Sequence, residues 1–297
     1  MKEITKENKL EQLLNDEENI DLKLSYSRIS DFSRNGPKAL IRPSNPEGDG
    51  LRFGSYVDDL LVDKVTNNNL CKNLYVVYDD NKPTATLGVL CDIIIDNYDT
   101  IPDVNTVLKI VKHNGFWSTT KDETKLIANF DKDEFWNYIK IKFETKDKVV
   151  VTQKESQDAE ECVGLLLNHK HTHHLFNNDF ENHYQFKFEY YYKGFHLRGI
   201  IDKMSIDHEN KIVYMEDIKT GSSRADEFTK SFIKYCYYFQ EAVYVKAFDS
   251  ICEQLGLVGY TLAPFKFIFI GRGEKVPHVF EISDKWHNAA INGFTTK

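Results

Sequence analysis

The stretch from Phe195 to Gly221 constrains the fold more than any other part of this 297-residue chain. It reads FHLRGIIDKMSIDHENKIVYMEDIKTG, with apolar and polar residues alternating on both sides of a polar segment. Alternation of this kind, interrupted by turn-forming residues, predicts two β-strands joined by a turn. We therefore expect strands over 195–206 and 211–219, and the rest of the chain has to be arranged around this pair.

The two predicted strands carry a small group of charged residues. Asp202 lies near the end of the first strand, and the second ends in Asp217-Ile218-Lys219. Because side chains alternate along a strand, Asp217 and Lys219 project from one face, while Ile218 and Glu216 project from the other. If the strands pair, Asp202 lies beside Asp217. An Asp-x-Lys sequence is also common on a solvated sheet rim, so this motif alone leaves both interpretations open.

Two carboxylates and one ammonium at one place have a chemical logic. Adjacent carboxylates repel each other, and a divalent cation removes the conflict. Carboxylate oxygens suit Mg²⁺ or Mn²⁺, which can activate a water molecule and polarise a phosphoryl oxygen. Lys219 could orient or deprotonate the attacking water, or stabilise charge on the phosphate. This group of residues therefore suits phosphodiester hydrolysis.

The bulk composition limits how the chain could hold nucleic acid. Hydrophobic residues make up 41% and charged residues 28%, which is typical of a soluble globular protein. The net charge is −8, the wrong sign for binding DNA through a general basic surface, so DNA contacts would have to be local. Five scattered cysteines, no apolar leader segment and no membrane-length apolar run indicate a cytoplasmic protein, in the host cytoplasm if it is viral.

The order of the predicted elements indicates one α/β domain over 1–297. Residues 1–20 are predicted as a loosely held N-terminal segment, and 66–150 as a mostly helical insertion. Further strands are expected at 74–80, 184–192, 264–271 and 278–282. Helices are expected at 25–40, 51–65, 88–98, 104–113, 121–129, 132–142, 153–171, 225–249 and 283–292. Strands mixed with helices in this order predict a mixed sheet with helices packed around it.

Two helices and one cluster carry further candidate residues. Gln240 and Tyr244 lie four apart and share a helix face, which suits a phosphate or base beside a metal but also fits a core helix. Asp58 lies one turn into its helix and reads equally well as a solvated acid. Histidines gather at 169–174, but no cysteine or acid follows at zinc-ligand spacing, so we interpret them as a polar helix end.

Taken in order, these motifs resemble the PD-(D/E)XK nuclease superfamily and, within it, the RecB-like and exonuclease VIII-like phage recombination nucleases. The resemblance covers most of residues 25–250. It rests on SRISDFSRNGPKAL, FGSYVDDLL, RGIID, EDIKTG and the following Gln-x-x-x-Tyr. It implies a restriction-endonuclease-like core, with a central mixed β-sheet flanked by helices.

The resemblance also implies roles for individual residues. Asp202 and Asp217 would ligate Mg²⁺ or Mn²⁺, with the Ile218 carbonyl as a backbone ligand. Lys219 would be the catalytic lysine, and Gln240 and Tyr244 would contact DNA near the scissile phosphate.

One further ligand is expected from the helix at 51–65. Asp58 stands where the family usually carries His, which makes it the predicted third metal ligand. Asp59 and Asp63 are the alternatives for this position.

The resemblance finally implies an activity and a setting. We expect a Mg²⁺-dependent exonuclease that acts on DNA ends in phage or mobile-element recombination or replication, with DNA and a single-strand annealing protein as partners. Some RecB-like nucleases hold an iron–sulfur cluster through a Cys before the Pro of the opening motif and a C-terminal Cys trio. Here Gly36 precedes Pro37 and no such trio follows Cys252, so we predict no cluster. The alternatives are an endonuclease of the same fold and a non-catalytic DNA-binding protein.

Overall fold

The computed structural model of the protein describes residues 23–40, 49–80, 82–83, 85–221, 224–274 and 276–293. The predicted N-terminal segment 1–20 lies outside these residues. The chain divides into two compact units, which are described separately. The first comprises Met1–Asp58 and Cys162–Lys297, and the second comprises Asp59–Glu161.

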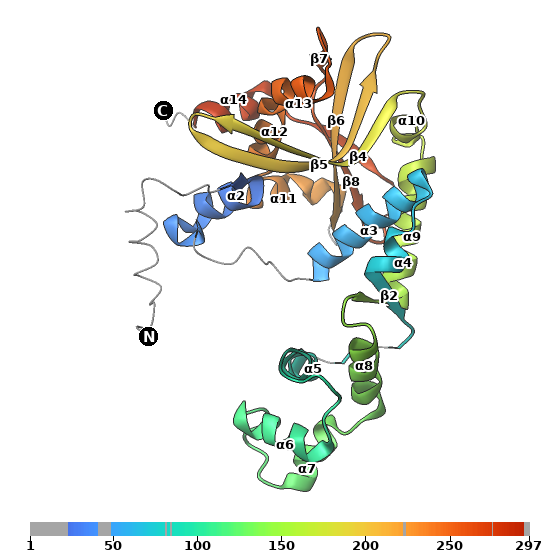
Figure 1. The fold of residues 1–297 in the computed structure, drawn as a ribbon, viewed down its shortest axis with the longest axis vertical. Coiled ribbons are helices and arrows are strands. Elements are labelled where there is room, and N and C mark those ends of the chain that lie inside the picture. Colours follow the sequence, from blue (N-terminus) through green and yellow to red (C-terminus); the bar gives the residue numbers. More distant parts are fainter. Residues whose placement is uncertain are drawn as a thin grey trace. The chain divides into compact units, whose positions relative to one another are not determined.

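The first unit is built on a mixed β-sheet flanked by helices, as the sequence predicts (Figure 1). In the described residues the sheet has seven strands: β1 (Leu24–Ser25), β4 (Glu181–Tyr192), β5 (Phe195–Asp207), β6 (Ile212–Gly221), β7 (Thr261–Leu262), β8 (Lys266–Gly271) and β9 (His278–Glu281). The main path runs β1-β5-β6-β8-β9, while β4 pairs with β5 and β7 with β6. β4 with β5, β5 with β6 and β8 with β9 are antiparallel, and the other pairs are parallel.

The predicted hairpin is confirmed as β5 and β6. Its turn is closed by Asp207, whose carboxylate accepts hydrogen bonds from the backbone N–H of Asn210 at 2.9 Å and from its side-chain amide at 2.8 Å. Lys211 completes the turn with a φ of 54°. An aspartate that binds the backbone a few residues ahead is a common way to stabilise a turn.

Two strands share one edge of β5. β4 pairs along nearly the whole length of β5 on one side. On the other side, β6 pairs with residues 203–207, and β1 pairs only with Leu197 and Arg198. Between these two partners, residues 199–202 of β5 have no register partner in β1 or β6. We call this segment the fork, and Asp202 lies in it.

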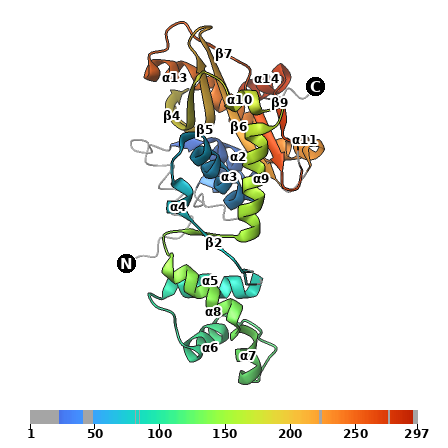
Figure 2. The same ribbon diagram turned by 90° about the vertical axis from the view of Figure 1, so that its right-hand side faces the viewer.

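Helices cover both faces of the sheet (Figures 1 and 2). Those in the first unit or entering it are α2 (Tyr26–Asn35), the short η1 (Pro37–Leu40), α3 (Asp49–Thr66), α9 (Gln153–Asn168), α10 (His173–Phe176), η2 (Ala225–Glu227), α11 (Phe228–Lys234), α12 (Tyr237–Lys246), α13 (Phe248–Leu255) and α14 (Asp284–Asn292). α12 contributes Val243 and Tyr244 to a core that includes Phe188 and Phe267 of the sheet. On the opposite face, Phe176 of α10 lies over the buried Lys203.

The single helix predicted over 225–249 is wrong, because this segment is broken into η2, α11, α12 and the start of α13. The main break is at Cys236, which has a left-handed backbone with φ 55°. Residues of α2 bind the carbonyl of the neighbouring Tyr235. It accepts hydrogen bonds from the Tyr26 hydroxyl at 2.5 Å and the Ser30 hydroxyl at 3.0 Å. Tertiary hydrogen bonds thus replace the helical ones that the sequence pattern would favour.

The second unit is mostly helical and contains the segment predicted as an insertion. Its elements are α4 (Leu70–Leu74), β2 (Tyr75–Tyr78), α5 (Ala85–Asn97), α6 (Val104–His113), α7 (Glu123–Phe130), α8 (Asp133–Glu144) and β3 (Val149–Thr152). β2 and β3 pair in parallel, and β3 was not predicted from the sequence. Phe130 and Phe135 are fully buried in the helical core. No helix in the described ranges has both the length and the apolar character that a membrane span requires.

Candidate active site

The hairpin brings two acids and a lysine of the predicted site together. β5 and β6 pair Lys203 with Glu216, and the same register places Asp202 opposite Asp217 at the next position. Asp217 is only 1% exposed, and its Oδ2 forms an ion pair with Nζ of Lys219. Its other oxygen, Oδ1, accepts a hydrogen bond of 2.5 Å from the side-chain amide of Gln240.

The carboxylate of Asp202 is held on both oxygens. Oδ2 accepts a hydrogen bond of 2.8 Å from the backbone N–H of Ile218, which lies between Asp217 and Lys219. Oδ1 accepts one of 3.3 Å from the amide of Gln185 in β4. The sequence does not predict Gln185 as a site residue, because nothing in YQFKFEYYY marks one polar residue as different from the others.

Burial and charge act against each other at Asp217. Burial raises the pKa of Asp217 to about 7, the ammonium of Lys219 opposes this rise, and the carboxylate of Asp202 adds to it. Burial alone would lower the pKa of Lys219, but the carboxylates of Asp217 and Asp202 outweigh it and raise that pKa. The lysine is thus held as a cation, while Asp217 can exchange a proton near neutral pH.

Aromatic rings surround the lysine. Its Nζ lies 5.0 Å from the ring centroid of Tyr237 and 5.9 Å from that of Phe267. Burial raises the pKa of the nearby Tyr26 hydroxyl, and the charge of Lys219 opposes this shift. Aromatic rings next to an ammonium stabilise its positive charge but carry no negative charge themselves. The acidic partners of Lys219 are therefore the two aspartates.

Gln240 and Tyr244 lie beside the aspartates but are both deeply buried, with 4% and 5% exposure. The Tyr244 hydroxyl accepts a hydrogen bond of 3.1 Å from the Gln240 amide and donates one of 2.6 Å to the carbonyl of Ile200. That carbonyl lies in the forked part of β5. Gly199 makes room for the tyrosine, because a Cβ there would lie 2.9 Å from the Tyr244 ring. In this structure the two residues brace Asp217 and the fork.

The donor set fits a hard divalent cation. Asp202 and Asp217 supply carboxylate oxygens, and Oε1 of Gln240 is buried without a hydrogen bond within the described part of the chain. A cation would also offset the burial of the Asp217 carboxylate and its repulsion by Asp202, which both raise the pKa of Asp217.

The role of Asp58 as a third ligand stays a prediction. Across the described ranges, no group of three or more His, Cys, Asp or Glu side chains is arranged to hold a metal. The neighbours of Asp58 have other partners: Asp59 accepts the hydroxyl of Tyr75 at 2.7 Å, and Asp63 accepts the backbone N–H groups of Leu70 and Cys71.

A second set of charges lies directly behind the first. Lys203 follows Asp202 and Glu216 precedes Asp217, so both side chains point to the other face of the sheet. There they form an ion pair of 3.1 Å, with 0% and 2% side-chain exposure. The register places Lys266 of β8 beside Glu216, and Glu281 of β9 beside Lys266. Burial lowers the pKa of Lys203, and Glu216 opposes that shift.

Two cavities lie near these elements and differ in chemistry. The polar one, of ≈ 770 Å³, is lined by Tyr244 and Ile200 of the site together with Tyr26, the cations Lys187 and Arg198, and the hydroxyls of Ser25 and Ser27. The second, of ≈ 400 Å³, is apolar.

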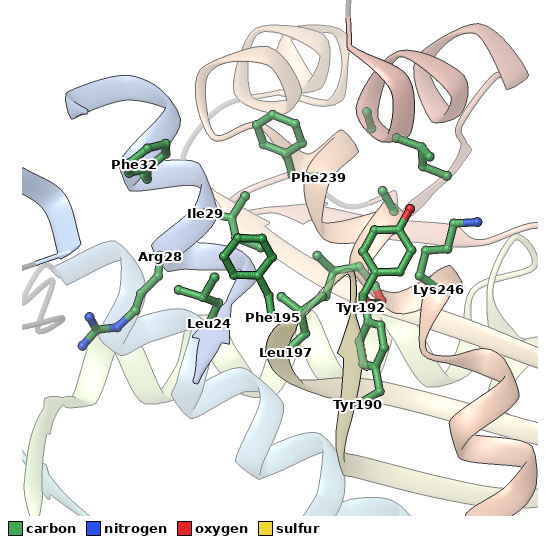
Figure 3. A pocket seen from close by; sticks show the side chains of 14 residues that line it. Leu24, Arg28, Ile29, Phe32, Tyr190, Tyr192, Phe195, Leu197, Phe239 and Lys246 are labelled. Atoms are coloured by element: carbon green, nitrogen blue, oxygen red, sulfur yellow. Dashed lines mark hydrogen bonds between the residues drawn. The ribbon is translucent and has the colours of Figure 1, made fainter. Parts of the chain in front are cut away.

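The apolar cavity lies between α2, the ends of β4 and β5, α12 and α14. Figure 3 shows Ile29, Phe195 and Phe239 around it, while the charged ends of Arg28 and Lys246 point away from the rings. Neither cavity is lined by the aspartates or by Lys219. The polar cavity has Tyr244 and Ile200 of the site in its lining, and its cations and hydroxyls suit a phosphate chain, while Glu189 adds one acid to it.

Comparisons with known proteins give a single type of match. No protein family and no curated protein matches the chain. Among solved structures, it is similar to a crystal structure described as "Putative exonuclease" from Eubacterium rectale. The sequence identity is 16% and the TM-score is 0.45, with 98% of this chain and 82% of that chain covered.

Proposed function

We propose that this protein is a metal-dependent deoxyribonuclease that hydrolyses phosphodiester bonds. The observation that carries the proposal is the convergence of Asp202, Asp217 and Lys219 at the fork of the sheet. A buried acid with a pKa near 7 beside a second acid and a fixed ammonium is expensive to maintain, and such groups concentrate at functional sites.

Asp202 and Asp217 would hold the cation, with the Ile218 carbonyl as a third oxygen donor. A bound Mg²⁺ or Mn²⁺ would polarise the scissile phosphate and make a water molecule a better nucleophile. Lys219 would lie beside the phosphate, where its charge stabilises the negative charge that develops during attack. Gln240 would keep Asp217 oriented, and Tyr244 would hold the edge of β5.

DNA would be held locally, because the chain carries a net charge of −8. Lys187 and Arg198 in the polar cavity would contact backbone phosphates, and the hydroxyls of Ser25 and Ser27 would add donors of the kind that proteins use for phosphate.

Action on DNA ends is the finer part of the proposal, and it rests on the resemblance to phage recombination nucleases. The same resemblance suggests a role in recombination or replication of a phage or mobile element, with a single-strand annealing protein as partner. The fork at residues 199–202 leaves Asp202 partly accessible, which suits a strand reaching it from the polar cavity. An endonuclease would use the same residues, so the mode of cleavage needs its own test.

The test is cleavage of linear, nicked and covalently closed circular DNA with Mg²⁺ or with chelator. We expect degradation of linear DNA with Mg²⁺ only, and intact closed circles. Cleavage of closed circles would show an endonuclease. No cleavage of any substrate, together with retained DNA binding, would show a non-catalytic DNA-binding protein and overturn the proposal.

A further inference from the structure

Gln185 has an unusual backbone for its position. It lies inside β4 with a φ of 51°, in the left-handed region that residues other than glycine rarely adopt. The register is the same on either side of it, with Tyr184 opposite Lys203 and Phe186 opposite Ile201. No residue is inserted into the strand here, so this conformation does not serve to shift the pairing, as a β-bulge would.

The conformation coincides with a contact to the site. Gln185 lies at the register position opposite Asp202, and its amide donates the hydrogen bond of 3.3 Å to Asp202 Oδ1. The other oxygen of Asp202 is held by the Ile218 N–H at 2.8 Å. One donor on each oxygen fixes the rotation of the carboxylate, which a single hydrogen bond would leave free.

We propose that Gln185 is a positioning residue that orients the carboxylate of Asp202 for cation binding, at the expense of a strained backbone. This inference rests on the proposed function. Strained residues persist where the surrounding structure enforces them and cluster at functional sites. Partners that orient a metal-binding carboxylate typically change metal affinity or activity by about 10- to 100-fold when they are removed.

A purely architectural role makes a different prediction. If the conformation served only to bend β4, glycine would serve at least as well, because it adopts positive φ without a steric penalty. The amide of Gln185 would then be dispensable. The side chain and the backbone can therefore be separated by substitution.

The experiment compares Gln185→Gly, Gln185→Glu and a control, Lys193→Gly. Lys193 is exposed, lies in the turn after β4 and has a φ of 49°, so its change to glycine relieves a similar strain away from the carboxylates. Gln185→Glu keeps the length of the side chain but removes the donor. The measurements are kcat and KM for DNA cleavage, the urea midpoint of unfolding, and Mn²⁺ binding by calorimetry without DNA.

We expect both glycine variants to unfold at the wild-type urea concentration or higher. Gln185→Gly should lose about 10- to 100-fold in kcat, with KM within about twofold, and bind Mn²⁺ at least about tenfold more weakly. Gln185→Glu should lose at least as much, and Lys193→Gly should match wild type. Retention of kcat and Mn²⁺ affinity by Gln185→Gly in an otherwise active protein would overturn this inference alone. A wild-type chain that neither binds Mn²⁺ nor cleaves DNA would overturn the proposed function, and this inference with it.

Discussion

Lys203 and Glu216 form a buried ion pair of 3.1 Å, and each is the direct neighbour along its strand of one of the two aspartates at the site. The pair ties β5 to β6 from the back of the sheet, immediately before the fork. Lys203 also contacts the hydroxyl of Ser205, which in turn donates to Asn182 of β4 at 2.7 Å. This polar network joins three strands behind the site.

Removing one partner of this pair should destabilise the protein strongly. Lys203→Met leaves Glu216 buried without its cation, which typically costs about 3–5 kcal/mol of unfolding free energy. The double variant Lys203→Met/Glu216→Leu should recover most of that loss, because well-packed apolar residues often replace a buried ion pair at little cost. Urea denaturation of both variants checks this expectation. A single variant as stable as wild type would contradict it.

Lys219→Ala should abolish most DNA cleavage while the fold is retained. We expect turnover to fall by about 10²- to 10⁴-fold, the range typical of a group that acts on charge or protons in the transition state. Lys230→Ala is a matched control, since Lys230 is 79% exposed and pairs with Glu227 at the surface. Initial rates on linear DNA and circular dichroism spectra of both variants test the expectation. Wild-type turnover in Lys219→Ala would remove the lysine from the proposed chemistry.

The raised pKa of Asp217 predicts a specific pH dependence. Between 3.8, its ordinary value, and about 7, the folded protein holds a proton on Asp217 that the unfolded chain has released. The contribution of Asp217 to stability is therefore highest below this window and falls as pH rises through it. Asp217→Asn removes this contribution, so the stability difference between variant and wild type should change between pH 4 and pH 7. Urea titrations without divalent cation measure it, and a constant difference would contradict the assignment.

Gly199→Ala should damage the site by crowding. A Cβ at this position would lie 2.5 Å from the Phe188 ring and 2.9 Å from the Tyr244 ring. We expect a loss of about 1–3 kcal/mol in unfolding free energy, typical of overpacking, together with reduced cleavage as Tyr244 is displaced. Gly164→Ala in α9 is the control, because nothing lies within 4 Å of its added Cβ. It should stabilise the helix by about 0.5–1 kcal/mol and leave cleavage unchanged.

The local pattern of the sequence predicted the hairpin, because alternation and the turn residues around Asp207 act within a few positions. It also placed Asp217 and Lys219 on one face, which is how the structure arranges them. The break at Cys236 could not be predicted in this way. It depends on hydroxyls from Tyr26 and Ser30, more than two hundred positions away, that bind the freed Tyr235 carbonyl. Local helix preference contains no information about such donors.

Gln185 escaped prediction for a related reason. Glutamine has no preference for positive φ, so only the tertiary contact with Asp202 explains its backbone. For Asp58 the resemblance alone predicts a ligand, and within the described residues no group of three or more potential ligands is found. The spacing of residues along a helix fixes the direction of a side chain only relative to the axis of that helix. Where the axis lies depends on the packing of the whole unit, which the spacing does not reveal.

The fork in the edge of β5 has a consequence for how the chain can be engineered. β1 contributes only Leu24 and Ser25, yet these two residues shield the start of β5 and lead directly into the helix whose hydroxyls bind Tyr235. Removing β1 would leave the backbone groups at the start of β5 free to pair with strands of other molecules. It would also free the kinked junction before α12 to straighten. Shortened versions should therefore keep Leu24 and Ser25 if a monodisperse protein is wanted.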